Sequence, residues 1–121
     1  MGLFSKKNSP EESQKRIAKT SQSPSERMEA IRGITDQQFL FDIAKNDNDF
    51  GVCKTAVEQL TNQEFLTAVG RDNAAHDWRA RTAAISRMND RAALQHIVDN
   101  EEEITVNYAA QERLKELDSQ E

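Results

Sequence analysis

The sequence predicts an all-α fold in which a pair of short helices is repeated about three times. A central alanine returns at intervals of 26, 28 and 26 residues, at Ala30, Ala56, Ala84 and Ala110. Each of the first three alanines is followed four residues later by an apolar residue and then by a polar helix-start signal. Apolar positions between these signals recur at helical spacing. Periods in this range are typical of repeat arrays, in which each unit buries its apolar face against its neighbours. We assign residues 25–117 to the repeats.

Residues 1–24 predict a flexible, basic N-terminal arm. The segment is polar and lacks apolar periodicity. Residues 1–25 carry five basic and two acidic residues, whereas the rest of the chain carries eleven basic and nineteen acidic ones. We expect at most a transient helix within this arm, because only Ile17 and Ala18 are available to bury.

The first residues of the arm leave a choice between a frayed start and weak membrane contact. Glycine follows Met1, but Lys6 stands where a myristoylation signal needs serine or threonine. We therefore expect no lipid anchor. Weak contact of a membrane or partner through Met1 to Lys19 remains the alternative, since Leu3 and Phe4 lie beside lysines.

The repeats then follow in order. Residues 24–33 predict a lone second-type helix that opens the array, with Ala30 and Ile34 facing inward. Each later repeat starts its first helix at a capping signal, and in the first two of these signals the threonine hydroxyl is expected to accept an orphan backbone N–H. These signals are Thr35-Asp36-Gln37-Gln38, Thr61-Asn62-Gln63-Glu64 and Asn89-Asp90. The first helices are expected to end at polar clusters near residues 45–48, 71–73 and 99–100.

The second helix of each repeat is expected to begin at an acidic residue, which suits a helix N-terminus. These acidic residues are Asp49, Asp77 and Glu103. An inward row at four-residue spacing follows each one, with the alanine at its centre allowing close approach of two helix axes. The rows are Val52, Ala56, Leu60; Ala80, Ala84, Met88; and Val106, Ala110, Leu114. The apolar residues Phe50, Trp78 and Ile104 share one repeat position, so we expect them to pack between repeats. Residues 118–121 predict a polar C-terminal tail.

The units resemble HEAT repeats, with residues 56–63 (Ala-Val-Glu-Gln-Leu-Thr-Asn-Gln) joining one unit to the next. The closest resemblance is to the short bacterial HEAT-like repeats of the phycobilisome-lyase type and to the leucine-rich repeat variant. The resemblance covers residues 24 to about 117 and implies a right-handed α-solenoid whose second helices line a concave, partner-binding side. The leucine-rich repeat variant can carry an iron–sulfur cluster, but this chain has a single cysteine, so no cluster is expected.

Residues that could carry chemistry are few. Cys53 is expected to be a small buried thiol, while His76 and His96 are expected at the surface without metal-ligand spacing. The scattered aspartates are explained by capping and solubility rather than by an acid/base pair. We therefore predict no catalytic residue, no metal site and no cofactor, and hence no enzyme.

The face opposite the inward row is the candidate binding surface. Its residues lie two before and two after each central alanine, or five before it. They do not repeat, and specificity can reside in non-repeating residues on a repeating frame. An ordinary solvated face remains the alternative. The candidate partner-binding residues are Met28, Arg32, Lys54, Glu58, Arg79, Thr82, Ser86, Thr105, Tyr108 and Glu112.

The leading function is a non-enzymatic protein–protein interaction module, expected to be monomeric and cytoplasmic. No cysteine framework, apolar span or signal peptide is visible in the sequence. An accessory factor for cofactor or chromophore attachment is one alternative. A nucleic-acid-binding protein is another, although the acidic balance past residue 25 argues against it, because phosphate binding needs clustered Lys and Arg. The identity of the partner protein is not predicted.

Overall fold

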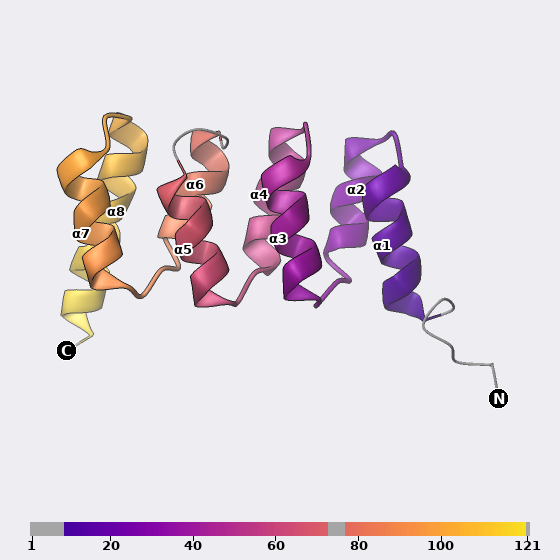
Figure 1. Cartoon of the computed structure of the whole chain (residues 1–121), viewed down its shortest axis with the longest axis horizontal. Coiled ribbons are helices and arrows are strands. Elements are labelled where there is room, and N and C mark those ends of the chain that lie inside the picture. Colours follow the sequence, from indigo (N-terminus) through magenta and orange to yellow (C-terminus); the bar gives the residue numbers. More distant parts are fainter. Residues whose placement is uncertain (1–8, 73–76, 121) are drawn as a thin grey trace. The chain divides into compact units, whose positions relative to one another are not determined.

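The computed structural model describes residues 9–72 and 77–120, which form eight α-helices and no strand. The all-α prediction is therefore confirmed for this part of the chain. Consecutive helices pair as hairpins, α1 with α2, α3 with α4, α5 with α6 and α7 with α8 (Figure 1). The helices are α1 Pro10–Thr20, α2 Pro24–Ile31, α3 Gln37–Asn46, α4 Phe50–Gln59, α5 Gln63–Arg71, α6 Trp78–Ile85, α7 Arg91–Asn100 and α8 Ile104–Ser119.

The hairpins fall into two compact units, unit 1 over Met1–Leu60 and unit 2 over Thr61–Glu121. Within unit 1, the two hairpins meet through α2 and α4. Within unit 2, they meet mainly through the corresponding pair, α6 and α8. In each unit, the second helices therefore form the joint between neighbouring hairpins.

The expected flexible arm over residues 1–24 is wrong for residues 10–20, which form α1. Ser9 caps this helix by accepting a hydrogen bond from the Glu12 N–H at 3.1 Å, and Pro10 occupies its first turn. Residues 24–33 are therefore not a lone half repeat, because α2 pairs with α1. The expectations for Met1 to Asn8 lie outside the described residues.

Polar contacts explain why apolar periodicity does not reveal α1. Only Ala18 is buried in this helix, and Ile17 is 40% exposed. Instead, the Glu11 carboxylate accepts hydrogen bonds from the Thr35 and Asp36 backbone N–H groups at 3.1 and 3.0 Å. Lys15 Nζ lies 2.8 Å from Asp36 Oδ2. Helix α1 is thus held against the start of α3 by polar side chains. In the sequence alone, such side chains cannot be distinguished from those of a solvent-exposed segment.

The predicted inward rows are buried with one exception. All four central alanines are at most 2% exposed, and the flanking residues of α4 and α6 are similarly covered. Leu114 is only half-buried, because α8 continues to Ser119 and buries Leu117 instead. The predicted boundary between repeats and tail at residue 117 therefore falls inside a helix.

The N-terminal caps of α3 and α5 shift by one residue from the predicted threonines. Asp36 and Asn62, rather than the threonines before them, accept the hydrogen bonds from the backbone N–H groups of Phe39 and Phe65. The expected acidic caps of the second helices, Asp49, Asp77 and Glu103, are confirmed. Carboxylate and amide oxygens perform the same task as a hydroxyl at this position.

A polar side chain three residues before each central alanine reaches the C-terminal end of the first helix in its hairpin. The backbone carbonyls at that end have no partner within the helix. In these hydrogen bonds, Arg27 donates to Ser21 O at 2.8 Å, Cys53 to Asp47 O at 3.1 Å, Arg81 to Gly70 O at 3.0 Å and Asn107 to Val98 O at 2.7 Å. Cys53 is 7% exposed, so the expected buried thiol is confirmed, and its sulfur serves as a structural donor.

The two arginines in this set also join the hairpins of their units. Arg27 forms two hydrogen bonds with Asp47, at 3.0 and 3.1 Å, and Arg81 lies 2.6 Å from Glu101. All four side chains are at most 11% exposed. The arginines are 54 residues apart, as are their acidic partners, which cap the C-termini of α3 and α7. Each unit thus contains one nearly buried ion pair at the same place.

Acid is expected to weaken the Arg81–Glu101 contact. The hydrogen bond from Arg81, followed by smaller effects that include the Glu103 N–H, lowers the pKa of Glu101 below its ordinary value of 4.5. A lowered pKa in the folded state stabilises the fold above pH 4.5, and this contribution is lost as the pH falls through the folded-state pKa. The Glu101→Gln variant should therefore be less stable than the native chain at neutral pH, with a difference that shrinks in acid. Urea unfolding across pH measures it, with the exposed Glu102→Gln as control; a constant difference would contradict the assignment.

Three apolar residues depart from their expected place. Phe50, Trp78 and Ile104 are 55%, 42% and 82% exposed, so they are not packed between repeats. Each is the first residue of its helix, beside the loop that enters it. The chain therefore presents apolar side chains where the sequence suggests core.

Candidate functional site

The ten predicted binding residues lie on second helices or directly after them, and none is buried. Four belong to unit 1, with Met28 and Arg32 on or directly after α2 and Lys54 and Glu58 on α4. Six belong to unit 2: Arg79, Thr82 and Ser86 on or directly after α6, and Thr105, Tyr108 and Glu112 on α8. The helix face predicted to point away from the core does so.

In unit 2 the structure brings five of the six together in one groove. The groove lies between α6 and α8 and has a volume of about 350 Å³. Its lining contains the predicted Thr82, Ser86, Thr105, Tyr108 and Glu112, together with Ala109, Arg113 and Glu116. Sequence reasoning missed the last three. Glu116 continues the four-residue spacing of Tyr108 and Glu112, so the helical period could have identified it.

Three hydroxyl groups of this groove donate hydrogen bonds to nearby acceptors. Thr82 Oγ1 donates to Arg79 O at 3.1 Å, and Ser86 Oγ donates to Ala83 O at 2.9 Å. Thr105 Oγ1 donates to Glu103 Oε1 at 2.8 Å. The hydrogen of each hydroxyl is therefore used within the protein, and its oxygen can still accept a hydrogen bond. The exposed surface of the groove is mainly apolar.

Charged residues border the groove toward the C-terminal part of α8. Arg113 donates to Met88 O at 2.8 Å and to Asn89 Oδ1 at 2.9 Å, which leaves its side chain only 15% exposed. The Glu116 side chain is 61% exposed and that of Glu112 is 41% exposed. Lys115 lies 3.0 Å from Glu112, and this hydrogen bond raises the pKa of the Lys115 amine.

Exposed apolar side chains lie near the other end of the groove, toward the start of α8. Tyr108 is 60% exposed, and Ile104 lies one turn before it on the same face of α8. Trp78 lies one turn before Thr82 on α6, and the Arg79 guanidinium sits 4.8 Å from its ring centroid. Tyrosine, tryptophan and arginine are the residue types most enriched at protein interfaces.

The corresponding place in unit 1 is occupied by the protein itself. Residues 54 positions before Thr82 and Thr105 are Met28 and Gly51. A Cβ atom placed on Gly51 would lie 3.4 Å from Met28 Sδ, so the thioether packs over the bare backbone of α4. The pair Met28 and Gly51 thus joins α2 to α4 where unit 2 has two threonines.

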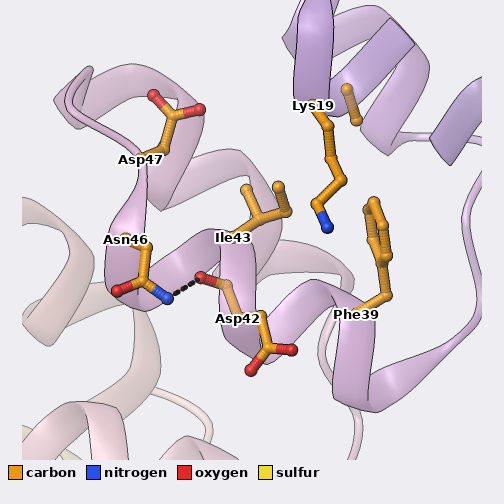
Figure 2. Close-up of a pocket in the computed structure, with 7 residues that line it drawn as sticks. Lys19, Phe39, Asp42, Ile43, Asn46 and Asp47 are labelled. Carbon is orange, nitrogen blue, oxygen red and sulfur yellow. Dashed lines mark hydrogen bonds between the residues drawn. The ribbon is translucent and has the colours of Figure 1, made fainter. Parts of the chain in front are cut away.

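A second hollow, which the sequence did not predict, lies between α1 and α3 in unit 1. It measures about 380 Å³ and is lined by Ala18, Lys19, Phe39, Asp42, Ile43, Asn46 and Asp47. Figure 2 shows the Lys19 side chain extending toward the Phe39 ring, and its amine lies 5.6 Å from the ring centroid. The hollow depends on α1, so recognising it required the position of a helix that the sequence pattern did not reveal.

The remaining candidates for chemistry stay apart. His96 is exposed and contacts Asn100 on its own helix, whereas His76 lies outside the described residues. In the described ranges, no three His, Cys, Asp or Glu side chains gather where they could hold a metal ion. Nor is any helix within these ranges both long and apolar enough to cross a membrane.

Comparison of the chain with protein-family models, with curated proteins and with solved structures finds no match in any of the three.

Proposed function

We propose that this chain is a non-enzymatic protein–protein interaction module: a small HEAT-like solenoid that binds another protein through the outward face of its second helices. The internal recurrence of sequence supports the repeat architecture. The non-repeating residues on that face support binding, because side chains that differ between equivalent repeats have no common packing role.

The groove between α6 and α8 is the observation on which this proposal rests. It gathers five residues selected for their position in the repeat, among them the exposed Tyr108, and the exposed Trp78 and Ile104 lie one helical turn from its lining residues. A concave apolar surface with aromatic neighbours is a typical docking place for a partner's side chains.

Site-specific photo-crosslinking of the full chain tests this function in the cells that produce it. A benzophenone amino acid replaces Tyr108 in the groove, or Gln95 on the exposed face of α7 as the matched control in the same unit. We expect a discrete protein adduct from position 108 alone, and its loss when Ser86→Arg fills the groove. Equal adducts from both positions, or an adduct that Ser86→Arg leaves unchanged, would refute the assignment.

A further inference from the structure

One difference between the groove of unit 2 and the matching place in unit 1 is an apolar side chain that only unit 1 has there. In unit 1, Met28 covers α4 at Gly51, with its sulfur within van der Waals distance of where a Cβ atom would stand. In unit 2, Thr82 replaces the methionine and Thr105 replaces the glycine. Threonine is shorter than methionine, and the hydroxyl of each threonine is held by an acceptor on its own helix or its N-cap. The groove therefore lacks the flexible apolar side chain that fills the matching place in unit 1.

The negative charge of unit 2 indicates which kind of partner could supply that apolar side chain. Unit 1 contains nine basic and nine acidic residues, whereas unit 2 contains seven basic and twelve acidic ones, so unit 2 carries the whole formal charge of −5. At the groove itself, Arg113 donates to Met88 O, to Asn89 Oδ1 and, at 3.0 Å, to Glu116 Oε1, and the Glu116 side chain remains 61% exposed. An acidic surface attracts basic partners and speeds their association.

The groove runs between two helices, and one of its edges changes character along α8. Ile104, Tyr108, Glu112 and Glu116 follow one another at four-residue spacing, so one ridge of the helix is apolar and then acidic. An amphipathic helix in a groove is anchored by apolar residues at three- and four-residue spacing, with polar residues alongside.

We infer that the α6–α8 groove receives a basic amphipathic helix of a partner protein. An apolar side chain of leucine or methionine size enters between Thr82 and Thr105, and Lys or Arg side chains of the partner meet Glu112 and Glu116. This inference rests on the proposed function and adds the chemical class of the partner.

Trp78 provides the readout, because it is the sole tryptophan of the chain and lies one turn from Thr82. Its fluorescence in the full-length protein is followed during titration with three synthetic peptides of about 15–18 residues, long enough to hold a helix. The first has leucines along one face and lysines elsewhere. The second replaces the leucines with alanine, and the third replaces the lysines with glutamate. We expect the leucine–lysine peptide to bind about tenfold or more tightly than either of the others, since each lacks one of the two interactions.

Two protein variants separate the apolar contact from the charge. The double variant Thr82→Met with Thr105→Gly rebuilds the arrangement of unit 1 and should weaken binding about tenfold, the factor expected when one buried apolar contact is lost. Gln95→Met adds a methionine at an exposed position of α7, away from the groove, and should leave binding unchanged. Glu112→Gln with Glu116→Gln should weaken binding at low salt and flatten its salt dependence, whereas Glu64→Gln on α5 should do so much less. If the Thr82→Met, Thr105→Gly double variant loses its helical circular dichroism signal, it has not folded. The Glu112→Gln, Glu116→Gln variant then tests the inference alone.

The outcomes also separate this inference from the proposed function. Equal binding of the lysine and glutamate peptides, or unchanged binding by the refilled groove, overturns the basic helix even if Tyr108 still crosslinks to a partner. Absence of a Tyr108-specific adduct overturns the function itself. Selective binding of the leucine–lysine peptide, lost on refilling the groove, supports the inference.

Discussion

Replacing Arg81 with methionine is expected to lower the free energy of unfolding by about 3–5 kcal/mol, the usual cost of removing one partner from a buried ion pair. The Arg81 side chain is 4% exposed and that of Glu101 is 11% exposed. The same guanidinium donates two hydrogen bonds to Gly70 O, at 3.2 and 3.0 Å. Methionine has a similar length but no donor, so both the carboxylate and the carbonyl lose this partner.

An exposed ion pair of the same unit is the control. Arg91 contacts Asp118 with side chains that are 42% and 68% exposed, so Arg91→Met should cost no more than about 1 kcal/mol. Chemical denaturation followed by circular dichroism measures both variants. Similar losses for the two arginines would show that Arg81 does not join the hairpins as described.

The second large effect is expected at Leu94, whose replacement by alanine should cost about 2–5 kcal/mol. Leu94 is 0% exposed on α7, and the deletion removes apolar contact and leaves a cavity. Leu40 on α3 stands 54 residues earlier, is also 0% exposed and should behave alike in unit 1. Ile17→Ala, at a residue that is 40% exposed, should cost no more than about 1 kcal/mol. Thermal unfolding of the three variants provides the measurement. If Ile17→Ala lowered the free energy of unfolding as much as Leu94→Ala, the core described here would be wrong.

Helices with a regular apolar row were predicted well. The alanines at four-residue spacing from Val52, Leu60 and Met88 identify the buried faces of α4 and α6, and Asp49 identifies where α4 starts. These signals are local, since a helical period and a cap need only neighbouring residues in the chain. The outward face follows from the same geometry, which is why all ten candidate residues lie off the core.

Helix α1 could not be predicted in this way. Besides its pairing with α2, its polar contacts are made by Glu11 and Lys15 with groups that lie more than twenty residues further along the chain. Likewise, Arg27 and Arg81 read as ordinary surface charges in the sequence. Only the folded hairpins place them against an acidic residue twenty positions away and against a carbonyl at a helix end. Long-range polar contacts leave no trace in the helical period of the apolar residues.

The sequence by itself determined the helical class, the spacing of the hairpins and the side of each second helix that avoids the core. These properties depend on where apolar residues fall around a single helix. Only the tertiary structure decided that α1 joins the fold, that a nearly buried ion pair joins the hairpins of each unit, and that unit 2 leaves open the place that Met28 fills in unit 1. A groove is empty space between two helices, so its existence depends on which side chains meet there rather than on the pattern within either helix.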